Sequence, residues 1–326
     1  MLREKFNNNI REKAKARFAK IALPDAEDIR VINAAIFLED NNIAKVFLVG
    51  DRLKIEHIAI ENNINIKNIE IIEPNKSNDI NTYTQKLYNK RKNKGLSEIE
   101  AFNKAKNPLY FSGFLLESGQ VDAVVAGNIS STSDVIRAGL YTVGLKPSIS
   151  LVSSFFIMVF DDKLYCFADC AVNPNPTSEQ LCDIAINSAQ NFEVITGEPA
   201  KVAMLSYSTN KSASGEMVAK VQIASKLLKE KSPNIISDGE MQLDAAINLS
   251  VAQRKFPSSK VAGQANVLIF PDLNAGNIGY KLVERLAGAE AIGPIVQGFA
   301  KPYCDLSRGC STEDIINVAS ICSLMA

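Results

Sequence analysis

Short apolar runs alternate with segments of helical period along most of the chain, and this alternation constrains the fold more than any other feature. Residues 27–42 carry apolar side chains at helical spacing, and the strand-like run 45–49 follows them. Further strand-like runs follow at residues 69–72, 121–126, 201–205 and 266–270. Strands that alternate with helices form mainly parallel sheets, so the sequence predicts an α/β protein.

The pattern changes near Pro147. Residues 149–160 are typical of a long strand, residues 161–163 of a turn and residues 164–167 of a returning strand, which together predict an antiparallel hairpin. A hairpin inserted into an α/β protein indicates the start of a second domain. The length of 326 residues agrees with about two domains.

Charge and composition exclude several classes of protein. The 36 Lys and Arg residues balance 36 Asp and Glu residues, whereas nucleic-acid and membrane-surface proteins normally carry a basic excess. The longest strongly apolar stretch, 151–160, is about half the roughly 20 residues that cross a bilayer. The basic N-terminus has no apolar signal region, so we expect a cytoplasmic protein without a membrane span.

The six cysteines and the single histidine give no sign of a metal site. The cysteines include no CxxC pair and have no histidine nearby in the sequence, so we expect free buried thiols and no bound metal. His57 lies in a polar stretch and is interpreted as a surface helix residue.

The segment 293–314 is the most informative part of the chain. A strand-like run ends in a Gly-, Pro- and Ser-rich loop that carries Lys301, Asp305, Ser307 and Arg308, and a helix is expected from about Ser311. Backbone amides in such a loop can approach an anion, and Arg308 offers a forked donor for phosphate oxygens. A structural interpretation stays open, in which Asp314 contacts amides of the first helical turn and Ser307 and Arg308 form a surface turn.

Three other segments could contact the same kind of ligand. The loop after 121–126 offers the amides and hydroxyls of residues 127–133, including Ser131 and Thr132, and Arg137 lies on the following helix. The basic run 86–94 is either a solvated helix surface or a site for a nucleotide-like phosphate. The segment 271–281 contributes Asn277 and Lys281 as candidate substrate contacts. Neither GxxxxGK[ST] nor an early GxGxxG is present, which disfavours a P-loop and a dinucleotide site.

Seven segments in order carry a resemblance to a known family. They are ALPDAEDIRVINAA, RKNKG, AGNISSTSDVIRAGL, NPNPTSEQL, DGEMQLDAA, FPDLNAGNIGYKLVERL and GPIVQGFAKPYCDLSRGCSTEDI. From about Ile21 to the C-terminus the chain resembles the phosphate acetyltransferase family, in its short single-module form. The resemblance implies acetyl-CoA + phosphate ⇌ acetyl phosphate + CoA, with coenzyme A as a substrate, no metal or redox cofactor, and a homodimer. It also implies two α/β domains that face an interdomain cleft, residues 1–148 plus 294–326 and residues 149–293.

The resemblance also implies residue roles. Asp314 matches the family base that takes the CoA thiol proton, Ser307 the group that contacts the reacting carbonyl, and Arg308 and Arg137 phosphate ligands. Arg91 matches an arginine associated with CoA binding. A free thiol titrates about 4.6 pH units above a free aspartate, so resting the proton on Asp314 costs roughly 6 kcal/mol unless its basicity rises or cations stabilise the thiolate.

Direct transfer in a ternary complex fits these residues better than an acyl-enzyme. Cys304 and Cys310 flank the SRG motif, but no histidine is available to activate either thiol. Cys304 also stands where the family commonly has Asn. The alternatives are a phosphate butyryltransferase and a catalytically silent CoA- or phosphate-binding protein; a nicotinamide-dependent dehydrogenase is less favoured.

Overall fold

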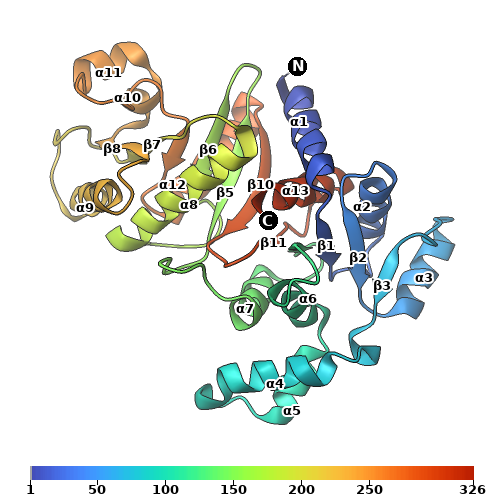
Figure 1. The fold of residues 1–326 in the computed structure, drawn as a ribbon. Coiled ribbons are helices and arrows are strands. Elements are labelled where there is room, and N and C mark those ends of the chain that lie inside the picture. Colours follow the sequence, from blue (N-terminus) through green and yellow to red (C-terminus); the bar gives the residue numbers. More distant parts are fainter. Residues whose placement is uncertain (1) are drawn as a thin grey trace. The chain divides into compact units, whose positions relative to one another are not determined.

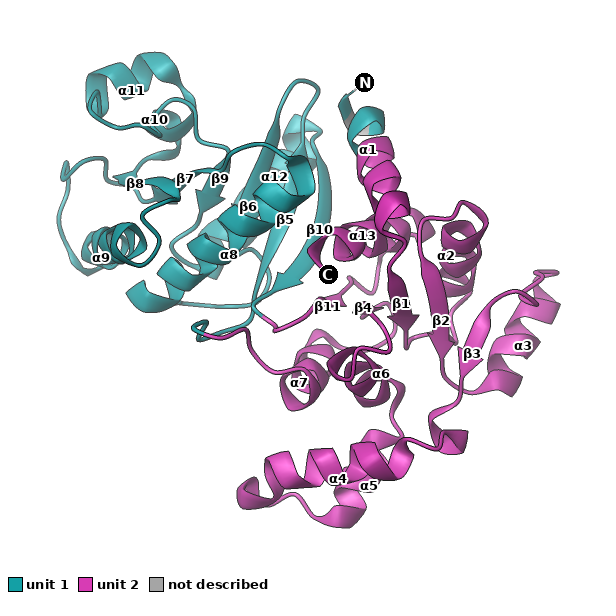
Figure 2. Ribbon diagram, in the orientation of Figure 1, with its two compact units in different colours: residues 1–6, 148–298 teal, residues 7–147, 299–326 magenta. Residues whose placement is uncertain are grey.

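The computed structural model describes residues 2–326, apart from the side chain of Arg3, and divides into two compact units (Figures 1 and 2). Unit 1 contains the chain up to Phe6 and residues 148–298, and unit 2 contains residues 7–147 and 299–326. The domain boundary expected at residues 293 and 294 falls inside strand β10 (Glu290–Gln297). This strand pairs with β5 (Ser153–Val159), so the chain stays in unit 1 until residue 298.

Unit 2 is built on a five-stranded parallel sheet with the strand order β11-β4-β1-β2-β3. Its strands are β1 (Lys20–Leu23), β2 (Lys45–Val49), β3 (Glu70–Ile72), β4 (Ala123–Ala126) and β11 (Tyr303–Asp305). All of β4 and β11 is buried, as expected where helices cover both faces of a parallel sheet. Because the five strands are parallel, their carboxyl ends lie along one edge.

Helices cover both faces of this sheet. The helices of unit 2 are α1 (Leu2–Arg17, of which residues 7–17 belong to this unit), α2 (Ile29–Asp40), α3 (Arg52–Glu61), α4 (Ile80–Arg91), α5 (Glu98–Ala105), α6 (Pro108–Glu117), α7 (Thr132–Thr142) and α13 (Thr312–Met325), with short 3₁₀ turns η1 (Pro74–Lys76) and η2 (Lys92–Lys94). Helices α4 and α5 pack on each other and on α6. Helices α2 and α13 pack together, and so do α6 and α7. The chain crosses from β1 to β2 in one direction and returns from β3 to β4 in the other, so right-handed crossovers place α2 and α6 on opposite faces.

Unit 1 is built on a six-stranded mixed sheet with the order β10-β5-β6-β9-β7-β8. Its remaining strands are β6 (Leu164–Ala168), β7 (Lys201–Leu205), β8 (Ile236–Met241) and β9 (Val267–Ile269). Strands β6, β9, β7 and β8 are parallel, whereas β5 pairs antiparallel with both β6 and β10. The predicted hairpin is therefore confirmed, with a first strand shorter than the expected 149–160.

Five helices complete unit 1. They are α8 (Ser178–Thr196), α9 (Glu216–Lys231), α10 (Leu243–Ile247), α11 (Leu249–Lys255) and α12 (Leu273–Ala287). Helices α8 and α9 pack together against the parallel strands, and α12 packs against β10, β5 and β6. Helices α5 and α8 each begin with a capping box, at Ser97 and Thr177 respectively. Within residues 2–326, no helix is long and apolar enough to span a bilayer.

The predicted class, α/β with two mainly parallel sheets, is confirmed. Strand β11 was not expected, because the sequence indicated only a loop between residue 296 and the last helix. Its three residues add to the edge of the unit 2 sheet beside β4, with Asp305 opposite Ala126. The loop that carries the SRG motif is therefore anchored by a strand immediately before it.

Candidate functional site

Three loops meet at the carboxyl edge of the unit 2 sheet. Strands β1, β4 and β11 are neighbours there, and each is followed by a loop that begins a helix: α2, α7 and α13 respectively. The N-terminal residues that cap these helices are Asp28, Ser131 and Ser311. Helix N-termini carry partial positive charge and unpaired amides, so this edge favours an anionic ligand.

Arg30, on the first turn of α2, ties the three loops together. Its Nη1 donates to the backbone oxygens of Arg308 (3.0 Å) and Cys310 (2.7 Å), and its Nη2 donates to that of Asn128 (3.1 Å). The same guanidinium forms a bidentate pair with Asp28, with Nη2 to Oδ2 at 2.6 Å. Burial raises the pKa of Asp28, but hydrogen bonds from Arg30 outweigh it and the pKa is lowered overall. One planar side chain thus holds the SRG turn against its neighbours.

Asp25 organises the loop after β4. Its Oδ2 accepts from the amides of Gly127 (2.8 Å), Ile129 (3.2 Å) and Ser130 (3.2 Å), and its Oδ1 accepts from the Ser130 hydroxyl (2.6 Å). The sequence had suggested that these amides are offered to an anion, and the structure shows that a carboxylate of the chain uses them instead. What remains for a ligand is the start of α7.

Ser131 and Thr132 stand at that start, and both hydroxyls have protein partners. Ser131 Oγ accepts from the amide of Asp134 (3.2 Å) and lies 2.7 Å from Asp134 Oδ2. The exposed Thr132 forms a side-chain hydrogen bond with Asp305, the last residue of β11. Both predicted substrate contacts therefore lie on the edge that carries the SRG turn.

Two of the three predicted catalytic residues, Ser307 and Arg308, lie on the loop from β11 to α13, and Asp314 lies on the first turn of α13; all three are exposed. Within the described part of the chain, Ser307 Oγ accepts a hydrogen bond from the amide of Gly309 alone, at 3.3 Å. The Arg308 guanidinium has no hydrogen-bond or ion-pair partner among residues 2–326. Asp314 Oδ2 accepts from the amide and the hydroxyl of Ser311, both at 2.8 Å, so the structural interpretation of Asp314 as a helix cap holds.

Arg137 and Arg91 lie nearby in unit 2, on α7 and α4. Arg137 pairs with Asp134 at 2.8 Å and is 48% exposed. It lines a cavity of about 380 Å³ with Lys104, Asn107, Tyr110 and Ser130, among others. Arg91 stacks over the Tyr141 ring at 3.9 Å. Tyr141 in turn packs edge-on against Tyr110, so an aromatic pair connects Arg91 to this cavity.

The rest of the basic run 86–94 is mainly structural. Lys86 pairs with Glu117 at 2.7 Å, and Lys90 donates to the backbone oxygen of Thr142 at 2.5 Å. These contacts fasten α4 to α6 and α7. Arg91 is the member of the run that the aromatic pair links to the cavity.

Asn277 and Lys281 lie on α12 in unit 1. Asn277 Nδ2 donates to the backbone oxygen of Cys170 at 3.0 Å, which gives it a structural partner, and Lys281 is exposed. Their predicted substrate contacts stay predictions.

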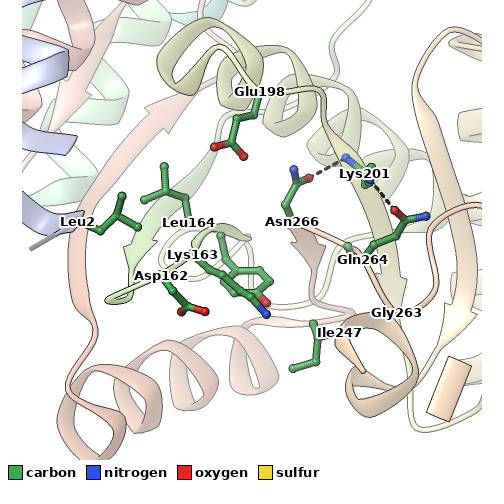
Figure 3. Close-up of a pocket in the computed structure, with 12 residues that line it drawn as sticks. Leu2, Asp162, Lys163, Leu164, Glu198, Lys201, Ile247, Gly263, Gln264 and Asn266 are labelled. Atoms are coloured by element: carbon green, nitrogen blue, oxygen red, sulfur yellow. Dashed lines mark hydrogen bonds between the residues drawn. The ribbon is translucent and has the colours of Figure 1, made fainter. Parts of the chain in front are cut away.

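Unit 1 also contains a cavity of about 390 Å³, lined by Lys201, Asn266 and Gln264 among others (Figure 3). It lies where β6, β7 and β9 begin, the edge opposite to the one at which α/β sheets usually bind ligands.

The cysteines near the SRG turn are buried. Cys304 forms a side-chain hydrogen bond with Cys322 of α13, whereas Asp305, the next residue of β11, points to the other face of the sheet. Burial raises the pKa of the Cys310 thiol to about 11.

Among residues 2–326, no three His, Cys, Asp or Glu side chains are grouped as metal ligands. His57 lies on the exposed side of α3, as predicted.

Sequence reasoning missed Asp25, Asp28, Arg30 and Asn128. The first three follow the apolar run Ile21–Leu23, and recognising that run as a strand would have placed them at a ligand-binding edge.

The sequence profile of the family described as phosphate acetyl/butaryl transferase matches residues 5–323. The phosphate acetyltransferase of Clostridium acetobutylicum is 48% identical over 98% of this chain and 97% of its own length. Two solved structures each align with 98% of this chain and over 98% of their own length. The EutD phosphotransacetylase from Staphylococcus aureus is 40% identical with a TM-score of 0.92, and a phosphotransacetylase from Streptococcus pyogenes is 36% identical with 0.94. The resemblance found in the sequence is confirmed, and the chain belongs to the phosphate acetyl/butyryl transferase family.

Proposed function

We propose that this chain is a phosphate acetyltransferase that moves an acetyl group reversibly between coenzyme A and inorganic phosphate. The observation that carries the proposal is the exposed set of Ser307 and Arg308 on the β11–α13 loop and Asp314 on the first turn of α13, beside the N-termini of α2 and α7. Relatives of the same family, including one that is 48% identical to this chain, are named phosphate acetyltransferase.

Phosphate, or the phosphoryl group of acetyl phosphate, binds at the start of α7. Arg308 supplies a guanidinium with no protein partner among the described residues, and Arg137 supplies a second one by leaving Asp134. Both can bind phosphoryl oxygens bidentately, and the amides of the first turn of α7 add to them. Exposure favours this role, because Arg308 is exposed and Arg137 pairs only with the surface carboxylate of Asp134 among the described residues, which an anion can displace.

The transfer is a direct attack without an acyl-enzyme. Asp314 takes the proton from the CoA thiol as the sulfur bonds to the acetyl carbon. The carbon–oxygen bond to phosphate then breaks, and phosphate leaves with the electron pair. Asp314 Oδ1 is the oxygen for the proton, because the helix cap occupies Oδ2. Ser307 donates to the carbonyl oxygen as negative charge develops there, and Arg308 stabilises thiolate and phosphate charge.

CoA extends from this point towards Arg91. The cavity beside Arg137 carries Lys104 and Tyr110, and Arg91 stacks on Tyr141 at its border, so cations and rings suited to a nucleotide with phosphates lie along one path. Asn277 and Lys281 of α12 are proposed as further substrate contacts. No resident metal or redox cofactor is part of the proposal.

The test is release of free thiol from acetyl-CoA with and without phosphate. We expect thiol and acetyl phosphate in equal amounts, and only when phosphate is present. Phosphate-independent release would mean hydrolysis, and no release would support the silent binding protein. Comparing acetyl-CoA with butyryl-CoA separates the two named activities, and a higher kcat/KM with butyryl-CoA would reassign the chain to butyryl transfer.

We also propose a homodimer in the cytoplasm. All six cysteines are free and buried, which supports a reducing compartment. Helix α12 exposes Ile278, Leu282 and Leu286, one turn apart and 51–81% accessible, and pairing with the same helix of a second copy would cover them. Sedimentation of the wild type and of Leu282→Glu tests this. A dimer in the wild type and a monomer in the variant are expected, and a monomeric wild type would contradict the proposal.

A further inference from the structure

Asp305 is a buried carboxyl that the proposed mechanism does not use. It is the last residue of β11, is 2% exposed, and lies between the SRG turn and the start of α7. The chain makes room for it with glycine: a Cβ on Gly127 would lie 2.2 Å from Asp305 Oδ1. A buried carboxyl in a space kept open by a glycine, one residue before the loop with the catalytic set, points to a role in that site.

The hydrogen bonds of this carboxyl are incomplete. The Thr132 side chain contacts it, but Oδ1 is buried with no partner among residues 2–326. The neighbouring Asp25 differs, because four donors satisfy its two oxygens. Of these two adjacent carboxyls, Asp305 is therefore the one suited to carry a proton, because its ionised form lacks the donors that satisfy both oxygens of Asp25.

The charged and titratable groups around Asp305 support the same assignment. Burial, together with the charge of Asp25, raises the pKa of Asp305 to about 7, and the Thr132 hydrogen bond offsets only part of this rise. The phenols of Tyr303, on the same strand, and Tyr110, on α6, also lie in this region; the Tyr303 hydroxyl donates to the Leu109 backbone oxygen. No cation among the described residues pairs with Asp305.

Thr132 connects this buried carboxyl to the surface. It is the first residue of α7, is exposed, and stands at the proposed phosphate site. A hydroxyl has one hydrogen to donate. If Asp305 is ionised, Thr132 donates to it; if Asp305 is protonated, Asp305 donates to Thr132 Oγ1 and the threonine hydrogen is free for a phosphoryl oxygen.

We propose that Asp305 is a positioning residue for the phosphoryl group, acting through Thr132, so that binding of a dianion is coupled to the uptake of one proton by Asp305. The proton comes from solvent and returns there when the anion leaves, and no covalent bond changes. Protonation does two things: it turns the Thr132 hydroxyl towards the ligand, and it removes a buried negative charge beside a dianion. This inference rests on the proposed function, because it assumes a phosphoryl ligand at the start of α7.

Sulfate is the probe, because it stays dianionic between pH 6 and 9 whereas phosphate itself titrates there. Calorimetry in buffers of different ionisation enthalpy counts protons taken up on sulfate binding. We expect the wild type to take up nearly one proton at pH 8, and its affinity to fall about tenfold per pH unit above pH 7. Asp305→Asn, which cannot ionise, should bind sulfate with no proton uptake and a flat pH profile.

Two variants of Thr132 test the route. Thr132→Ser keeps the hydroxyl and should keep the wild-type pH dependence. Thr132→Val should bind sulfate more weakly at pH 6, where Asp305 is protonated. A fall in Asp305→Asn as steep as in the wild type, or wild-type affinity at pH 6 in Thr132→Val, would overturn the inference. A wild type that binds sulfate with proton uptake but has no acetyl transfer activity would instead contradict the proposed function alone.

Discussion

Asp314 combines an observed structural role with a proposed catalytic one. Its Oδ2 closes a capping box with Ser311, so an alanine in its place removes a helix cap and a base together. Asp314→Asn separates the two roles, because its amide oxygen can still accept from Ser311 but cannot take a proton. We expect Asp314→Asn to unfold within about 2 °C of the wild type, and Asp314→Ala to lose about 1 kcal/mol of stability.

Both variants should lose acetyl transfer by at least about 100-fold in kcat, as expected for loss of a general base. Thermal unfolding and the thiol-release assay measure the two effects on the same preparations. Substantial turnover in Asp314→Asn would show that Asp314 acts as a cap and that another group accepts the proton.

Asp305 gives unfolding a pH dependence of defined sign. Its pKa is about 7 in the folded chain and about 3.9 when unfolded, so between these values the folded state holds a proton that the unfolded state has released. The contribution of Asp305 to the free energy of unfolding is therefore fully present below about pH 4. It is lost as the pH rises to 7, and the loss reaches about 4 kcal/mol.

Asp305→Asn should remove this loss. Urea unfolding at pH 5, 6, 7 and 8 should show the variant gaining stability relative to the wild type up to pH 7, and no further gain above it. A stability difference that is independent of pH would show that Asp305 does not titrate in this range.

At the scale of elements, the junction of β4 and β11 depends on the backbone of Gly127. Its φ of +106° is rare for residues with a side chain, and an added Cβ would also lie 2.6 Å from the amide of Leu306. We expect Gly127→Ala to lose about 3 kcal/mol or more. Gly144 is the matched control: its φ is +79° but nothing lies within 4 Å of an added Cβ, so Gly144→Ala should lose about 1–2 kcal/mol.

Chemical denaturation of the two glycine variants provides the comparison. Equal losses would mean that backbone conformation alone matters at both positions. In that case the space beside Asp305 would have no energetic importance.

Arg30 makes the three loops behave as one element. Lysine keeps the charge but cannot reach Asp28, Asn128 and the SRG turn together, so the turn would lose its fixed position. We expect Arg30→Lys to lower kcat by roughly 10- to 100-fold, since small displacements of reacting groups have effects of this size. Arg52→Lys is the control, because Arg52 pairs with Glu56 and Glu73 on α3 and near β3, and it should leave kcat unchanged. Wild-type kcat in Arg30→Lys would show that the loops hold their positions without this residue.

How far the sequence predicts the elements depends on their length and pattern. The helix near residues 27–42 and the hairpin were predicted because apolar periodicity and turn residues are local signals. Strand β11 was not, because three residues after Pro302 are too short for a period. The site followed the same rule: the SRG loop was found from its residue types, whereas Asp25 and Arg30 act through contacts about 100 and 280 residues away.

At the scale of the whole molecule, unit 2 alone brings together Ser307, Arg308, Asp314, Arg137 and Arg91. The segments that do so are distant in sequence, because the last 28 residues, 299–326, return to the sheet formed by the first part of the chain. Unit 1 contributes the candidate contacts Asn277 and Lys281 and the exposed stripe on α12. The proposed phosphate chemistry in unit 2 and the proposed dimer contact in unit 1 should therefore be separable by mutation.

The central claim is direct transfer of the acetyl group without a covalent link to the protein, and isotope exchange tests it most directly. The enzyme is incubated with acetyl phosphate and labelled inorganic phosphate in the absence of CoA. An acyl-enzyme would release phosphate and move label into acetyl phosphate. Direct transfer predicts no exchange until CoA is added, in the wild type and in Cys304→Ala alike. Label in acetyl phosphate without CoA would contradict the account.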